Sequence, residues 1–174
     1  MAAAAATKPS KAAPPAAPGA LDSFKYKHTP EDADNLASEL IPSNILNDLG
    51  DSNWKTRLAA LDEMNTWLEG VVEGVDAEVL IRALAKKGWA EKNFQVSAKI
   101  YGVCALLAER STSFGRSCVA LCVPHMSEKL GDMKLKKPAG DTLLVFAEKT
   151  SLQFVLNQGM GPCSSFHARS NILL

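Results

Sequence analysis

Three residues of this 174-residue sequence have the types and spacing of a possible metal site. Cys118, Cys122 and His125 form a C-x3-C-x2-H cluster. Cysteines four positions apart share one face of a helix, but a closed zinc site takes four ligands and the sequence supplies no fourth nearby. Their neighbours Val119 and Leu121 are apolar. We therefore predict that these residues pack inside a helical domain and bind no metal.

Two further patterns do not fit catalytic motifs. Ser113, Ser117 and His125 have no supporting acid at a useful spacing, so they predict no catalytic triad. Gly159-Met160-Gly161 follows no predicted strand and opens no helix, which argues against a phosphate-binding loop. We expect a protein that is not an enzyme and that uses no cofactor.

Polar turns that carry positive charge recur at a fixed spacing. Each turn precedes an amphipathic helical pattern, and the three are Asn53-Trp54-Lys55, Lys92-Asn93-Phe94 and Asp132-Met133-Lys134. The spacing is 40 residues from Trp54 to Phe94 and again from Phe94 to Lys134. A period of about 40 residues with two helices per period is typical of HEAT repeats. Because stacked repeats bring equivalent turns side by side, we expect these turns to form one ridge.

The composition of this ridge predicts an acidic protein partner. The capping residues 51–53 place Trp54 at a helix start, partly exposed, although it could equally fold back onto the preceding helix. Phe94 is expected to pack inward, and Glu91 beside Lys92 is interpreted as ordinary surface charge. Lysines steer an encounter and a tryptophan anchors it. The candidate binding residues are Trp54, Lys55, Lys92, Asn93, Lys134 and Lys136.

The elements that position the turns are helices. Residues 30–158 show helical periodicity and no convincing strand, beginning with the start signal Thr29-Pro30-Glu31-Asp32. We predict an all-α fold: an α-solenoid of about three HEAT helix pairs. Pro124 should kink or split the helix that contains it. A helix at about 139–150 should turn Leu143 and Leu144 inward.

Composition sets the remaining expectations. Residues 1–29, rich in alanine and proline, predict a disordered linker, and residues 159–174 predict an irregular tail. Lysines and arginines number 19, as do aspartates and glutamates, so we expect no nucleic-acid partner. No apolar run approaches the roughly 20 residues that span a membrane. The four cysteines should be reduced thiols in the cytosol. The oligomeric state is left open by the sequence.

Three stretches resemble parts of a TOG domain: DSNWKTRLAALDEM, LAKKGWAEKNFQV and KLGDMKLK. The chain is similar, over about residues 40–150, to a middle member of the TOG array in the microtubule polymerase family. The resemblance implies a paddle of HEAT repeats that binds αβ-tubulin, or the microtubule lattice, through intra-repeat loops. It also implies a place in the cytoplasm and cytoskeleton, on microtubules, the spindle and the centrosome. The alternative is a generic HEAT scaffold that binds a peptide on its concave face.

Individual positions can be carried over from the resemblance. Trp54 matches the first-loop tryptophan that packs against β-tubulin, and Lys55 falls at the adjacent basic position. Asn93 falls in the second loop, and Lys134 matches the basic residue of the third loop. The fourth and fifth loops would lie beyond residue 158, so the resemblance implies a truncated domain. This sequence also departs from the family pattern, because Pro138 and Gly140 are expected to interrupt the third paired helix sooner than that pattern does.

Overall fold

The computed structural model describes residues 23–160 and confirms the all-α prediction, because these residues form helices and no strand. The α-helices are α1 (Pro30–Leu40), α2 (Ser43–Asp48), α3 (Trp54–Val71), α4 (Ala77–Gly88), α5 (Phe94–Arg110), α6 (Arg116–Glu128), α7 (Lys136–Lys149) and α8 (Leu152–Gly159), with the short 3-10 turn η2 (Lys129–Gly131) before α7. In the described part of the chain, no helix combines the length and apolarity needed to cross a membrane. The predicted tail lies outside the described residues from 161 onward.

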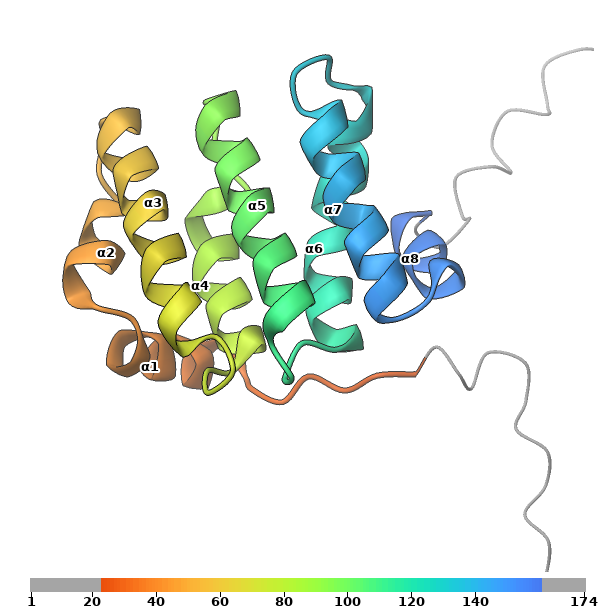
Figure 1. Cartoon of the computed structure of the whole chain (residues 1–174), viewed down its shortest axis with the longest axis horizontal. Helices are drawn as coiled ribbons and strands as arrows, with labels where there is room; N and C mark the ends of the chain where they lie inside the picture. Colours follow the sequence, from red (N-terminus) through yellow and green to blue (C-terminus); the bar gives the residue numbers. More distant parts are fainter. Residues whose placement is uncertain (1–22, 161–174) are drawn as a thin grey trace, which may run out of the picture.

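The helices stack in two layers, as a solenoid of HEAT repeats requires. In Figure 1, α3, α5 and α7 stand side by side in one layer, and contacts join α3 to α5 and α5 to α7. Helices α4, α6 and α8 form the second layer, where α4 packs on α6 and α6 packs on α8. The pairs α3/α4, α5/α6 and α7/α8 are therefore the three predicted repeats. Helix α1 crosses this arrangement and packs against α4.

The buried face of α3 follows the predicted periodicity. Leu61, Met64 and Leu68 are fully buried, and their spacing of three or four residues places them on one side of the helix. The end of the face differs from the prediction, because Val71 is exposed and Val72 is buried instead. The helix ends at Val71, so the 3.6-residue period no longer fixes which side chain turns inward.

Pro124 does not split its helix, so that part of the prediction is wrong. Helix α6 runs without a break from Arg116 to Glu128. Cys122, Val123 and Met126 around the proline are fully buried between the neighbouring helices. This packing holds the helix together although the proline removes one backbone hydrogen bond.

Helix α7 also departs from its predicted form. It begins at Lys136 and includes both Pro138 and Gly140, so the predicted interruption is wrong. Pro138 is the third helical residue, where a backbone N–H has no partner within the helix and its loss costs little. The inward face is carried by Phe146, which is fully buried, whereas Leu144 is 62% exposed and was wrongly expected to turn inward.

Residues 23–29, which we call the strap, pack against the solenoid although they lie in the predicted linker. The strap runs beneath the helices in Figure 1, from the α8 end toward α1. The ring of Phe24 meets Phe154 of α8 edge-on, with centroids 5.9 Å apart. The linker boundary predicted at residue 29 therefore lies too far along the chain. Residues 1–22 of that linker are outside the described part.

The strap is fixed by the buried carboxylate of Glu78 in α4. The backbone N–H groups of Lys27 and His28 donate to its oxygens at 3.1 and 3.4 Å, and Arg82 donates at 3.2 Å. Burial by itself raises the pKa of Glu78, but these hydrogen bonds outweigh it and lower the pKa below the ordinary 4.5. Asp76 adds an exposed contact to Lys27 at 3.4 Å. The strap, residues 23–29, is therefore part of the packed domain.

A candidate interaction ridge along the helix starts

The predicted turns meet at one edge of the solenoid. Helices α3, α5 and α7 all begin at the upper edge in Figure 1, and their neighbours in the layer are in contact. We call the three turns, residues 51–55, 91–95 and 132–136, the turn ridge. A stacked solenoid places equivalent turns next to one another, which is the arrangement expected from the 40-residue period.

An acidic side chain braces each turn of the ridge in the same way. Its carboxylate accepts a hydrogen bond from the backbone N–H two residues later, which closes a compact local turn. The three bonds are Asn53 N to Asp51 Oδ1 at 2.6 Å, Asn93 N to Glu91 Oε1 at 2.8 Å and Lys134 N to Asp132 Oδ1 at 2.8 Å. The first two turns share a backbone geometry, with φ −81° and ψ 119° at Asn53 and φ −82° and ψ 119° at Asn93. In the third turn, Asp132 itself stands at the equivalent position, with φ −83° and ψ 127°.

Two asparagines then cap the helices that follow. The side-chain oxygen of Asn53 accepts from the N–H of Lys55 at 3.0 Å. Asn93 does the same for Gln95 at 2.9 Å and for Val96 at 3.4 Å. A cap satisfies backbone donors that a helix leaves unpaired at its start. The side-chain oxygen of Asn93, a predicted binding residue, is thus already engaged in positioning its own turn.

An ion pair joins the first turn to the second. Arg57 donates to both carboxylate oxygens of Glu91, at 2.7 and 2.9 Å, and also to the carbonyl oxygens of Asp51 and Ser52. The side chain of Glu91 is only 7% exposed. Burial raises the pKa of Glu91, but the Arg57 hydrogen bond and the backbone donors outweigh it and lower the pKa.

Reading Glu91 as ordinary surface charge was therefore wrong, because it is the acid that braces the second turn. One pattern in the sequence does indicate this role of Glu91. Asp51 stands two residues before the first asparagine cap, and Glu91 stands two residues before the second. An acid repeated at the period of the repeat indicates a structural role in each turn.

Aromatic rings line the ridge beneath two of its lysines. Trp54 is half-buried against the core, and the ammonium of Lys55 lies 5.9 Å from its ring. Phe94 is 40% exposed, and the ammonium of Lys134 from the third turn lies 4.4 Å from its ring. The expectation that Phe94 packs inward is wrong. It is the first residue of α5, and the buried face of that helix begins only at Val96.

The remaining candidates of the ridge are exposed cations. Lys55, Lys92, Lys134 and Lys136 are all exposed, and none of them forms an ion pair with another described residue. The neighbouring Lys137, by contrast, pairs with Asp141 at 2.6 Å. The side chain of Met133 in the third turn, which the sequence prediction did not include, is 98% exposed. The ridge therefore offers unpaired positive charge beside exposed apolar atoms.

Comparisons with known proteins agree with this geometry. No family model matches the chain. It is 37% identical over 138 residues to Protein mini spindles of Drosophila melanogaster, covering 75% of this chain and 6% of the relative. The solved structure titled Drosophila melanogaster Mini spindles TOG3 matches with a TM-score of 0.59 at 38% identity. The alignment covers 67% of this chain and 53% of that one. The solenoid is a TOG domain.

A plant relative supports the same assignment. Protein MOR1 of Arabidopsis thaliana is 31% identical over 130 residues, which is 74% of this chain and 7% of the relative. The chain thus spans less than a tenth of the length of these curated relatives. The resemblance noted in the sequence is confirmed at the level of the TOG domain.

The cysteine and histidine cluster is part of the packing of this TOG domain. Cys118 and Cys122 are fully buried in α6, and burial raises the pKa of Cys118 to about 11. The ring of His125 stacks on Trp89 with centroids 4.5 Å apart, and its Nε2 lies 3.2 Å from the hydroxyl of Tyr101. Within residues 23–160, no group of three or more histidine, cysteine or acidic side chains is arranged to hold a metal ion.

Proposed function

We propose that this TOG domain binds αβ-tubulin through the turn ridge and thereby contributes to the regulation of microtubule polymerisation. The observation that carries the proposal is the set of exposed lysines on the ridge, which pair with no described carboxylate and of which Lys55 adjoins the half-buried Trp54. An exposed row of cations favours an acidic protein surface and speeds the encounter with it. The microtubule cytoskeleton is the corresponding location.

Each part of the ridge would have its own role in this interaction. Lys55, Lys92 and Lys136 would attract the acidic surface, because none of them forms an ion pair with a described residue. Trp54 and Phe94 would supply apolar contact area that excludes water around those charges. The braced turns would keep these groups in place before binding, which reduces the entropy lost on association.

The test is size-exclusion chromatography of the full chain with soluble αβ-tubulin, beside the double variant Trp54→Ala and Lys55→Ala. Loss of a buried tryptophan anchor typically costs about 2 kcal/mol or more of binding free energy. We therefore expect the wild-type chain to co-elute with tubulin and the double variant to elute separately. Pelleting with stabilised microtubules, run in parallel, distinguishes lattice binding from dimer binding.

A matched control removes the same residue types from the opposite edge. Lys25→Ala with Tyr26→Ala deletes one lysine and one exposed aromatic residue of the strap. This variant should still co-elute with tubulin. The proposal fails if the wild-type chain, shown by circular dichroism to be helical, binds neither dimer nor lattice. It also fails if the ridge and strap variants lose binding equally.

A further inference from the structure

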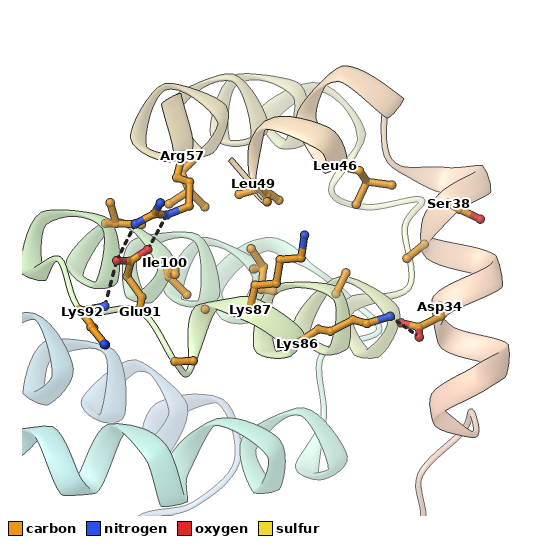
Figure 2. Close-up of a pocket in the computed structure, with 18 residues that line it drawn as sticks. Asp34, Ser38, Leu46, Leu49, Arg57, Lys86, Lys87, Glu91, Lys92 and Ile100 are labelled. Carbon is orange, nitrogen blue, oxygen red and sulfur yellow. Dashed lines mark hydrogen bonds and ion pairs between the residues drawn. The ribbon is translucent and has the colours of Figure 1, made fainter. Parts of the chain in front are cut away.

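A groove lies beside α4 at the end of the solenoid where α1 and α2 pack on different layers. Helix α2 packs on α3 in the first layer, and α1 packs on α4 in the second. Helix α2 has 6 residues and α3 has 18, so α2 is shorter than α3 by roughly 18 Å at 1.5 Å per residue. The space left between α1, α2 and α4 is a cavity of about 500 Å³ that opens to solvent. Figure 2 shows it, and we call it the α2–α4 groove.

The inner surface of the groove is apolar. Leu46 and Leu49 of α2 form one wall and remain half-buried, so their side chains are still reachable from solvent. The other apolar lining residues come from α1, α3, α4 and α5 and include Ala37, Leu61, Leu84, Val96 and Ile100. Half-buried leucines beside a fully buried floor are typical of a surface that gains free energy when a further apolar group covers it.

The rim of the groove carries an excess of positive charge. Lys86 pairs with Asp34 of α1 at 2.7 Å, and Arg57 pairs with Glu91 at the other end. Lys87 pairs with no described carboxylate, and in Figure 2 it extends from α4 toward α2 across the open space. The nearby lining residue Lys92 is likewise without an ion pair among residues 23–160. The groove therefore combines an apolar floor with cations that lack acidic partners.

We infer that the α2–α4 groove binds a short, acidic, amphipathic helical segment of a partner protein. The groove is apolar inside and bounded by packed helices, which is the kind of surface that the apolar face of an amphipathic helix occupies. Apolar side chains of that segment would cover Leu46 and Leu49, and a carboxylate would meet Lys87. A volume of about 500 Å³ is within the usual range for a binding pocket. The groove adjoins the turn ridge at Glu91 and Lys92, whereas Leu46, Leu49 and Lys87 lie outside the ridge.

The test uses two defined probes and the full chain. One is a blocked, fluorescein-labelled peptide of twelve residues (~3 turns) with leucines on one helical face and glutamates on the other. In the second, lysine replaces every glutamate. Fluorescence anisotropy should show binding of the acidic peptide and about tenfold weaker binding, or none, of the basic one. Amide chemical shifts of ¹⁵N-labelled protein should change in α1, α2 and α4.

Matched variants assign the site. Lys87→Glu should weaken the acidic peptide about tenfold, since it places a carboxylate opposite the glutamates. Lys136→Glu makes the same change of charge on the turn ridge and should alter the affinity less than twofold. For the apolar wall, Leu46→Ser should weaken binding, whereas Leu130→Ser, at a leucine that is 39% exposed near the third turn, should not. Circular dichroism verifies that every variant is folded.

Four results would overturn the inference. They are no binding up to millimolar peptide, equal affinity for the two peptides, amide shifts confined to the turn ridge, and a loss caused by Lys136→Glu but not by Lys87→Glu. Each can occur whether or not the chain binds tubulin. Failure at the groove is therefore distinguishable from failure of the proposed function, which is measured by co-elution.

Discussion

The two edges of the solenoid differ in whether their charged side chains have partners within the molecule. At the strap edge, the buried Glu78 accepts hydrogen bonds from two backbone N–H groups and from Arg82, and Asp76 pairs with Lys27. At the ridge edge, Lys55 and Lys136 point into solvent without an ion pair to any described residue. Charges satisfied inside the molecule hold its parts together, whereas unsatisfied exposed charges are available to a partner.

The contrast is not complete, because the ridge contains one internal pair of its own. Arg57 and Glu91 lie beneath the exposed lysines and fasten the first turn to the second. The ridge therefore has a fixed base and a free surface. Substitutions at the strap edge should change stability alone, those at the base of the ridge should change both stability and binding, and those on its surface should change binding alone.

The largest effect is expected for Glu78→Ala. The change leaves two backbone N–H groups and Arg82 without their acceptor inside a fully buried site. Breaking such a buried interaction typically costs about 3 kcal/mol of unfolding free energy, measurable by urea denaturation. Glu73→Ala, at an exposed position, should change it by less than about 0.5 kcal/mol. An equal loss in both variants would contradict the role given to the strap.

The next effect is expected for Glu91→Ala, at the base of the ridge. It removes the acceptor of the Asn93 N–H and leaves Arg57 partly buried without its partner. We expect a loss of about 2 kcal/mol in unfolding free energy and roughly tenfold weaker tubulin binding. Glu91→Gln keeps a hydrogen-bond acceptor, so its unfolding free energy and its tubulin affinity should lie between those of Glu91→Ala and the wild type. Unchanged tubulin binding in a destabilised variant would show that the base does not position the ridge.

A smaller effect, on binding alone, is expected for Phe94→Ala. The ring is exposed and supports the ammonium of Lys134, so its removal should weaken tubulin binding by about 1 kcal/mol, roughly fivefold. Thermal stability should be nearly unchanged. Leu144→Ala, at an exposed apolar residue of α7, is the control and should bind like the wild type. Fluorescence anisotropy with labelled tubulin measures both, and equal affinities would remove Phe94 from the contact surface.

The smallest effect is expected when the pH is lowered, and it concerns the melting temperature. Hydrogen bonds hold the pKa values of Asp76 and Glu78 below their ordinary values of 3.8 and 4.5. A lowered folded-state pKa contributes stability that is present above the ordinary value and is lost as the pH falls through the folded-state value. The melting temperature should therefore drop between about pH 5 and about pH 3, and drop less in Glu78→Gln. Equal drops in melting temperature for the wild type and Glu78→Gln would show that the Glu78 carboxylate does not contribute to the pH dependence of stability.

The helical elements could be predicted because their signals are local. The buried face of α3 with Leu61, Met64 and Leu68 follows the helical period, and Thr29 accepts from the N–H of Asp32 as the capping pattern requires. Pro138 misled the prediction for the same reason. In a sequence, a proline predicts a break in a helix. At the third position of α7 it removes no hydrogen bond within the helix, because the backbone N–H there has no intrahelical partner.

The candidate ridge could be predicted only in part. The 40-residue period determined that three turns would lie side by side, since each repeat stacks on the next. Which side chains are exposed depended on contacts between repeats. The exposed position of Phe94 beneath Lys134, and the burial of Glu91 beneath Arg57, join residues from different turns that no local pattern relates.

The sequence by itself thus determined the helices, their period and the edge at which the basic turns gather, because periodicity and capping act within a few residues. The tertiary structure decided which charges are satisfied. Lys27 and His28 meet Glu78 across about fifty residues of chain, and the α2–α4 groove forms only because α2 packs on α3 while α1 packs on α4. Such partnerships depend on distances in space, which the order of residues along the chain does not specify.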